Sequence, residues 1–269
     1  MNNQQSIHTS GTGSDTGITG AAGTTGSGGF SSGRTEEAAR PGSLRFTTLL
    51  LDVDGTLLDF DAAERHGVCA VMRAHGIEPT EERVQRYHQI NQGFWKAFER
   101  GDIPKEAIFQ KRYPQFFSEL GVSVTSSEAE ARYRRELDAC AILLPGALEI
   151  CGYLKERYAL YVVTNGVAAT QYSRLGLSGL DRYFQDIFVS EDARSQKPQK
   201  EYFDYCFARI PEKDLSKMMI IGDSLTSDIR GGKNVGIATC WLNPYDHTAP
   251  PELKPDFEIQ DLEELKNFL

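Results

Sequence analysis

Two carboxylates, Asp52 and Asp54, close an apolar run at residues 45–53 and stand on either side of Val53. Two carboxylates at this spacing can divide the work of phosphate-ester hydrolysis. One can attack phosphorus and form an aspartyl-phosphate, and the other can protonate the leaving oxygen and later activate water. The pair therefore predicts covalent and acid–base chemistry, provided that the rest of the chain supplies a phosphate site and a cation.

Polar side chains also follow three later apolar runs. They are Thr164 and Asn165 after the second run, Lys197 after the third, and Asp223 and Asp228 after the fourth. Ligands of open parallel sheets bind at the carboxyl ends of the strands, so these groups should meet at one edge. Clustered carboxylates there suit Mg²⁺, with Mn²⁺ as an alternative, because hard cations prefer oxygen ligands. Thr164 can hydrogen-bond, and Lys197 can neutralise, the phosphoryl oxygens.

Each piece alone also has a simpler interpretation. The pair Asp54-Gly55 is an ordinary turn signal, an Asp after a strand often caps the next helix, and Lys197 could be solvated. The five histidines show no ligand spacing, which suggests surface or packing positions. Chemistry is favoured because all four segments carry polar groups at the same end of their runs.

The apolar runs themselves read as buried parallel strands separated by helical patterns, which predicts an α/β fold with a doubly wound parallel sheet. The predicted strands are residues 45–53, 158–164, 186–190, 218–223 and 238–242, with an edge strand at 257–259 and a closing helix at 260–269.

The gap between the first two strands, residues 61–140, is too long for one crossover helix. Helix signals recur in it, such as an N-cap at Thr80 and a stop at Gly101. This predicts a helical cap that is inserted directly over the two carboxylates. The catalytic core would then comprise residues 44–60 and 141–269.

Composition narrows the class of protein. Residues 1–43 are dominated by Gly, Ser and Thr and predict a disordered tail. The 29 basic and 38 acidic residues give a net charge of −9, which argues against a nucleic-acid partner. Five widely spaced cysteines without a CxxC pair argue against disulfides and zinc, and fit a cytoplasmic location. The sequence predicts no signal peptide, no membrane association and no obligate protein partner.

Four segments, in order, resemble the motifs of the haloacid dehalogenase superfamily: DVDGT at 52–56, TNG at 164–166, KP at 197–198 and GDSLTSD at 222–228. The resemblance spans the chain from about residue 44 onward. It implies a Rossmann-like core with a helical cap between the first and second motifs.

By that resemblance Asp52 is the nucleophile and Asp54 the general acid and base. Mg²⁺ would be held by Asp52, the backbone carbonyl of Asp54, and Asp223, with Asp228 as a supporting acid. Within the superfamily the second Asp distinguishes phosphohydrolases from dehalogenases, so Asp54 argues against carbon–halogen cleavage.

The same resemblance assigns phosphate binding to Thr164 and Lys197, with Asn165 and Gly166 beside them as substrate-binding residues. The chain departs from the family pattern at one place. Before the KP motif, where related proteins tend to carry small residues, this chain has Ala193-Arg194.

Longer stretches are similar to the bacterial pyrimidine 5′-nucleotidases. They are residues 57–64, 90–103, 164–184 and 236–244. Those enzymes dephosphorylate pyrimidine nucleoside monophosphates, including deoxy and non-standard ones, so the resemblance implies a small phosphorylated substrate of this kind.

The cap is expected to select the leaving group, because it alone lies above a generic phosphate site. Asn91 interrupts an apolar helix face there and could read the base, or it could be a buried polar side chain satisfied within the protein. The aromatic side chains of Trp95 and Phe60 could contact the base, although most such residues are simply core.

Three alternatives remain open at this point. The protein could be a sugar-phosphate or phosphoglycolate phosphatase of the same fold, or a mutase that transfers phosphate to a second hydroxyl. It could also be a non-catalytic binding protein on this scaffold, although such a protein could dispense with Asp52, Asp54, Lys197 or Asp223, and all four are present.

Overall fold

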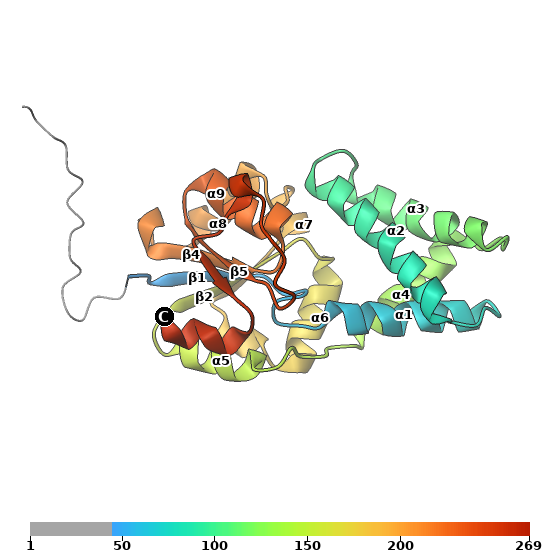
Figure 1. Ribbon diagram of the computed structural model, residues 1–269, viewed down its shortest axis with the longest axis horizontal. Coiled ribbons are helices and arrows are strands. Elements are labelled where there is room, and N and C mark those ends of the chain that lie inside the picture. The colour runs from blue at the N-terminus through green and yellow to red at the C-terminus, as the bar shows by residue number, and fades with distance from the viewer. Residues whose placement is uncertain (1–44) are drawn as a thin grey trace, which may run out of the picture. The chain divides into compact units, whose positions relative to one another are not determined.

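The computed structural model describes residues 45–269, so the tail predicted at 1–43 lies outside the described residues. The described chain builds a parallel sheet of six strands in the order β3-β2-β1-β4-β5-β6. Figure 1 labels four of these strands, β1, β2, β4 and β5. The strands are β1 (Thr48–Leu51), β2 (Ala159–Thr164), β3 (Asp186–Val189), β4 (Met218–Gly222), β5 (Ala238–Leu242) and β6 (Phe257–Ile259). The predicted α/β class and parallel sheet are confirmed.

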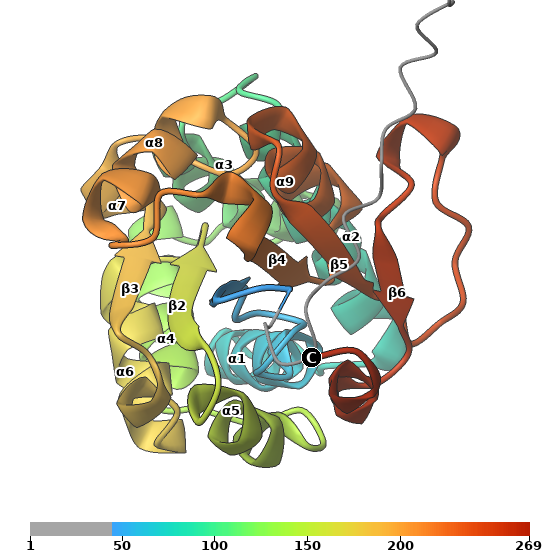
Figure 2. The same cartoon turned by 90° about the vertical axis from the view of Figure 1, so that its left-hand side faces the viewer.

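Both faces of the sheet are covered by helices, which is why the strands are apolar on both sides. Leu49 and Leu51 point into one core, and Leu50, between them, points into the other. The first core lies against α5 (Ala147–Lys155) and α6 (Ala168–Ser178), and the second lies against α8 (Lys200–Arg209) and α9 (Arg230–Val235) (Figure 2). This is the doubly wound arrangement that the apolar runs predicted.

Shorter elements complete this layer structure. They are α7 (Ser190–Ala193), η1 (Asp181–Tyr183), η2 (Leu215–Lys217), η3 (Leu225–Ile229, a π-helix), η4 (Pro251–Leu253) and η5 (Leu262–Asn267). The closing helix predicted at 260–269 is the short 3₁₀ helix η5. Asp261 is its N-cap, and the Asp261 side chain accepts a hydrogen bond from the Glu264 N–H.

Four further helices lie between β1 and α5, and we call them the cap helices. They are α1 (Phe60–Ala74), α2 (Glu81–Glu99), α3 (Lys105–Glu119) and α4 (Ser126–Asp138). They enclose a core of their own that is rich in aromatic side chains, among them Tyr87, Tyr113, Phe116, Phe117 and Tyr133. The predicted N-cap is confirmed, because Thr80 Oγ1 accepts a hydrogen bond from the Arg83 N–H at 3.4 Å. The domain boundaries predicted at 61 and 140 stay a prediction.

The central position of β1 determines which loops meet. Leu51 pairs in register with Val162 of β2 on one side and with Ile221 of β4 on the other. The segments that follow these three strands therefore emerge together at the carboxyl edge of the sheet. Among residues 45–269, no helix is long and apolar enough to cross a membrane.

Candidate active site

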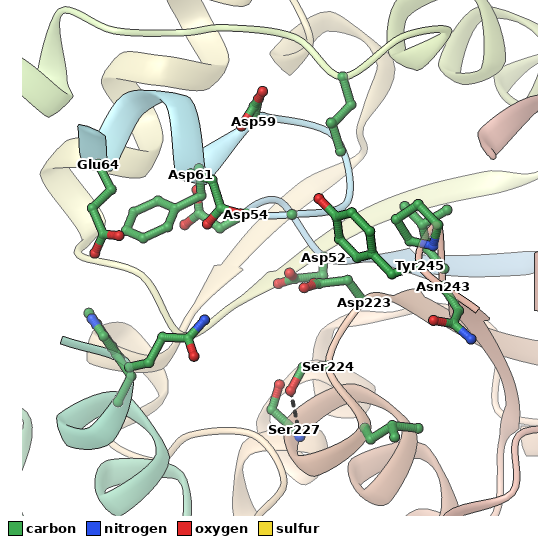
Figure 3. Close-up of a pocket in the computed structure, with 18 of the residues that line it drawn as sticks. Asp52, Asp54, Asp59, Asp61, Glu64, Asp223, Ser224, Ser227, Asn243 and Tyr245 are labelled. Carbon is green, nitrogen blue, oxygen red and sulfur yellow. Dashed lines mark hydrogen bonds between the residues drawn. The ribbon is translucent and has the colours of Figure 1, made fainter. Parts of the chain in front are cut away.

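Three carboxylates meet at the carboxyl edge of the sheet, as the sequence predicted. The carboxylate oxygens of Asp52, Asp223 and Asp228 lie within 4.8 Å of one another. Asp52 and Asp223 line a pocket of about 1320 Å³, together with Asp54 and Thr164 (Figure 3). The first and fourth sequence segments are thus brought to one site.

Lys197 is the cation of this cluster. Its side chain is 1% exposed, and Nζ donates hydrogen bonds to Asp52 Oδ1 (2.6 Å), Asp228 Oδ1 (2.7 Å) and the Val163 carbonyl (2.8 Å). Burial alone would lower the pKa of Lys197, but the charges of Asp228 and Asp52 outweigh it and raise the pKa. Because its three N–H donors are all used, Lys197 fixes the positions of both carboxylates. We call Asp52, Asp223, Asp228 and Lys197 the floor cluster.

The floor cluster carries more negative than positive charge. Burial raises the pKa of Asp52 well above its usual range; Lys197 opposes that shift, whereas Asp228 and Asp223 add to it. Burial, followed by the charge of Asp228, raises the pKa of Asp223 to about 7. Two buried carboxylates, Asp52 and Asp228, and the more exposed carboxylate of Asp223 thus face one ammonium group, an imbalance that a divalent cation would relieve.

The free oxygens of the floor cluster fit such a cation. Lys197 uses Oδ1 of Asp52, and the Thr56 hydroxyl is 3.3 Å from Oδ1 of Asp223. Within residues 45–269, this leaves Oδ2 of Asp52 and Oδ2 of Asp223 for a metal ion, whereas Oδ2 of Asp228 accepts a hydrogen bond from the Ser224 N–H. Gly55, with φ of +81°, makes room for this arrangement, because a Cβ there would lie 2.6 Å from Asp223 Oδ2.

Asp54 has different partners from those of the floor cluster. Its carboxylate pairs with the guanidinium of Arg174, which is fully buried, and accepts a hydrogen bond from Gln171 Nε2 at 2.5 Å. Both partners lie on α6. The sequence analysis missed them, although their spacing of three residues in a predicted helix just after the TNG segment places them on one helix face.

The loop after β2 is organised around Lys197. The Asn165 side chain donates to the Lys197 carbonyl and accepts from the Lys197 N–H, both at 2.9 Å. Thr164 Oγ1 accepts a hydrogen bond from the Gly166 N–H at 3.0 Å. Thr164, Asn165 and Gly166 all line the pocket, but the amide of Asn165 is already engaged with the chain at Lys197. Nearby, Arg194 ends α7 in the left-handed conformation, with φ of 53°.

Asn91 belongs to a buried chain of polar contacts inside the cap helices. Its Nδ2 donates to Glu64 Oε1 (2.6 Å), and its Oδ1 accepts from Arg112 Nη1 (2.9 Å). The chain continues to His88, whose Nδ1 is 2.5 Å from Glu64 Oε2, and to Glu130, which receives Arg112 at 2.7 to 2.9 Å. We call these five residues the cap network. It favours the interpretation of Asn91 as a satisfied buried polar group, even though Asn91 touches the pocket.

The two aromatic residues predicted to contact substrate, Trp95 and Phe60, also line the pocket, where both are half-buried. The Trp95 ring packs edge-on against Phe98 and Phe109, with centroids 5.9 and 6.5 Å apart. Phe60 packs against the cap core and lies 5.9 Å below the Arg174 guanidinium.

The cap helices also touch the loops that carry the predicted site, through residues that the sequence analysis did not identify. Lys105, 8% exposed, donates from Nζ to the Gly166 carbonyl and to Ser190 Oγ, both at 2.8 Å. Glu99 accepts a hydrogen bond from the Thr226 hydroxyl at 2.6 Å. No local pattern marks these residues, because their partners lie 61 to 127 positions away.

Comparison with known proteins identifies the family. The model of the haloacid dehalogenase-like hydrolases matches residues 46–236. The HAD-hydrolase YfnB of Bacillus subtilis is 44% identical over 84% of this chain and 96% of its own length. The pyrimidine 5′-nucleotidases PynA of Streptococcus pneumoniae and YjjG of Escherichia coli are 36% and 30% identical, over 82% and 84% of this chain and 94% and 99% of their own.

The fold agrees with a solved structure of one of these relatives. A crystal structure of YfnB bound to magnesium, described as revealing interdomain movement, superposes with a TM-score of 0.80. The superposition covers 83% of this chain and 98% of the YfnB chain.

Proposed function

Because this chain belongs to the haloacid dehalogenase-like hydrolases, we propose that it hydrolyses pyrimidine nucleoside 5′-monophosphates with the help of Mg²⁺. The family and the nucleotidase relatives make it a phosphomonoester hydrolase that takes a small phosphorylated substrate. The observation that carries the proposal is the floor cluster, in which three carboxylates and one lysine from three distant segments share one site.

In this proposal Asp52 attacks phosphorus and forms an aspartyl-phosphate. Asp54 protonates the 5′ oxygen as the phosphorus–oxygen bond to the nucleoside breaks. Water then attacks the phosphorus while Asp54 takes up its proton, and Asp52 is regenerated as phosphate leaves. Gln171 and Arg174 hold the Asp54 carboxylate at the pocket between these steps.

Asp52 and Asp223 of the floor cluster would hold the metal ion together with the backbone carbonyl of Asp54. Asp228 would support them by fixing the position of Lys197. Bound Mg²⁺ would neutralise the surplus negative charge and polarise the phosphoryl oxygens. Thr164 and the loop through Asn165 and Gly166 would donate hydrogen bonds to the same oxygens.

The proposed substrate class rests on the nucleotidase relatives and on the pocket. Its cavity of about 1320 Å³ extends from the floor cluster to the cap helices, which leaves room for a nucleoside beyond the phosphate. The division into a core (44–60 and 141–269) and a cap (61–140) is part of the proposal, with Trp95 in the cap and Phe60 at the boundary between the two, both lining the pocket.

A substrate panel tests the proposal directly. Purified protein is incubated with uridine, cytidine and thymidine 5′-monophosphates, ribose 5-phosphate and phosphoglycolate, each with Mg²⁺ or with EDTA, and phosphate release is measured. We expect the highest kcat/KM for the pyrimidine nucleotides and no turnover in EDTA. A higher kcat/KM for ribose 5-phosphate or phosphoglycolate would replace the nucleotidase assignment with another phosphatase of this family, and full activity in EDTA would remove the metal from the mechanism.

A further inference from the structure

Tyr245 is an exposed aromatic residue at the pocket. Four large hydrophobic side chains are exposed in residues 45–269, and Tyr245, at 73%, is the most exposed of them. The other three, Ile142, Tyr172 and Leu177, do not line the pocket that contains Asp52. Figure 3 shows the Tyr245 ring among the pocket side chains, projecting from the loop that follows β5. A single exposed aromatic residue needs no explanation by itself. The position at the pocket singles out Tyr245, because an aromatic ring there can contact a ligand.

The loop holds this ring in a defined place. Asn243, 2% exposed, accepts a hydrogen bond from the His247 N–H at 3.0 Å and donates to the His247 carbonyl at 2.8 Å and to Glu258 at 2.6 Å. Between them Asp246 adopts the left-handed conformation, with φ of 53°. The turn that carries Tyr245 is therefore held by three part-buried hydrogen bonds of the buried Asn243 side chain, so the loop under the exposed ring is braced.

The loop that carries Tyr245 lies at a distance from Asp52 that suits the base of a nucleotide whose phosphate is at Asp52. β5 pairs with β4, and β4 pairs with β1. The loop after β5 therefore lies two strand spacings, roughly 10 Å, from the strand that leads to Asp52. Trp241, at the end of β5, fixes this distance by donating from Nε1 to the Asp223 carbonyl at 2.7 Å. A nucleoside 5′-monophosphate likewise separates its base from the phosphorus by the width of a sugar.

The other aromatic residues of the pocket are less available. Trp95 and Phe60 are half-buried and already pack against neighbours, as described above. The ring neighbour of Tyr245 is His247, at a centroid distance of 5.8 Å. Tyr245 can therefore offer a ring face to a ligand without first giving up a packed contact.

We propose that Tyr245 is a specificity-determining residue whose ring stacks on the planar base of the substrate. The proposal rests on the proposed nucleotidase function and adds the residue that reads the base. Stacking accepts any flat heterocycle. Tyr245 therefore accounts for a preference for nucleoside over sugar phosphates, and not for a choice among uracil, cytosine and thymine.

The experiment measures the ratio of kcat/KM for uridine 5′-monophosphate to that for ribose 5-phosphate, in the presence of Mg²⁺. We expect Tyr245→Ala to lower this ratio roughly 10- to 100-fold through a higher KM for the nucleotide. Tyr245→Phe and Tyr245→Trp, which keep the ring, should retain the ratio. Tyr172→Ala is the matched control, because Tyr172 is also exposed (47%) but lies outside the pocket. Thermal unfolding of each variant checks that it is folded.

The outcomes separate the two proposals. A nucleotide preference that is as strong in Tyr245→Ala as in the wild type overturns the role of Tyr245 and leaves the nucleotidase function standing. A wild-type ratio near one overturns the nucleotidase function, and the role of Tyr245 with it. A ratio that falls equally in Tyr245→Ala and Tyr245→Phe contradicts stacking, because the ring is still present in the second variant.

Discussion

The floor cluster and the cap network are two largely buried polar networks that each contribute residues to the same pocket, yet their charges are arranged in opposite ways. In the floor cluster three carboxylates share one lysine, and Asp52 and Asp223 keep one oxygen each outside the hydrogen bonds of residues 45–269. In the cap network Glu64 and Glu130 are matched by His88, Asn91 and Arg112, and Glu130 also pairs with Arg134 at 2.8 Å.

This difference in charge balance distinguishes a reactive site from a structural support. Buried charges are costly unless they are paired and hydrogen-bonded, so a balanced network is expected where the role is structural. An unbalanced one persists where a ligand or ion completes it. By this argument the floor cluster is built for chemistry, and the cap network holds the helices that stand over it. The first two predictions below would fail if the two networks had the same role.

The largest expected effect is on turnover, in the floor cluster. Asp52→Asn removes the proposed nucleophile, so we expect kcat to fall at least ~10³-fold. Thermal stability should not fall, because the substitution removes one of the surplus negative charges. Asp204→Asn, on the exposed end of an ion pair with Lys200, is the control and should keep wild-type turnover. Wild-type turnover by a clean preparation of Asp52→Asn would refute the assignment.

The next effect is on stability, in the cap network. Arg112→Met leaves the buried Asn91 side-chain carbonyl without its partner and Glu130 with Arg134 alone, so we expect a loss of about 3–5 kcal/mol in the free energy of unfolding. Urea denaturation measures it. Arg86→Met breaks a half-exposed pair with Glu119 and should cost no more than ~1 kcal/mol. Equal losses in the two variants would show that the cap network is not a structural support.

A smaller effect is expected where cap and core touch. Lys105→Met removes the hydrogen bonds to the Gly166 carbonyl and to Ser190, so the loop after β2 should be less well placed. We expect kcat to fall roughly tenfold, with a smaller change in KM. Lys111→Met, on the exposed side of the same helix, is the control. An unchanged kcat in Lys105→Met would mean that the contact does not position the loop.

The smallest effect concerns pH and the metal. The raised pKa of Asp223, about 7, means that the folded, metal-free protein binds a proton that the unfolded chain releases near pH 4. Stability from this group is therefore present at low pH and is lost as pH rises through about 7. Mg²⁺ competes with that proton, so the gain in Tm on adding Mg²⁺ should be larger at about pH 8 than at about pH 5.5.

The control for this comparison is the same pair of scans on Asp223→Asn. This variant has no carboxyl proton at position 223, so its gain in Tm, if any, should depend less on pH than that of the wild type, with Asp52 as the remaining metal-binding carboxyl whose pKa is raised. A gain in the wild type that is equal at the two pH values would argue against a cation at the floor cluster.

The sequence was sufficient for the floor cluster because its information is local. Asp52 and Asp223 come directly after buried apolar runs, Lys197 follows another run a few residues later, and parallel strands must deliver those ends to one edge. The register of β1 with β2 and β4 then brings Asp52 and Asp223 together without any further information. The fold class was predictable from the same runs.

The remaining contacts join residues that no local pattern connects. Lys105 reaches Gly166 across 61 positions, and Arg112 reaches Asn91 from the neighbouring helix. The sequence left open whether Asn91 faces a ligand or a protein partner, because an apolar face interrupted by an amide is compatible with both. Tyr245 was missed because it stands in a loop, where side-chain direction follows no period.

The central claim is that Asp52 becomes phosphorylated. The direct test uses Asp54→Asn with Mg²⁺ and acetyl phosphate, a donor whose leaving group needs no proton from Asp54. The reaction is quenched in acid, the protein is digested, and the masses of the peptides are measured by mass spectrometry. The account predicts a phosphoryl group on Asp52, accumulating because the group that activates water is gone. A phosphoryl group on another residue, or phosphate release with none on Asp52, would contradict it.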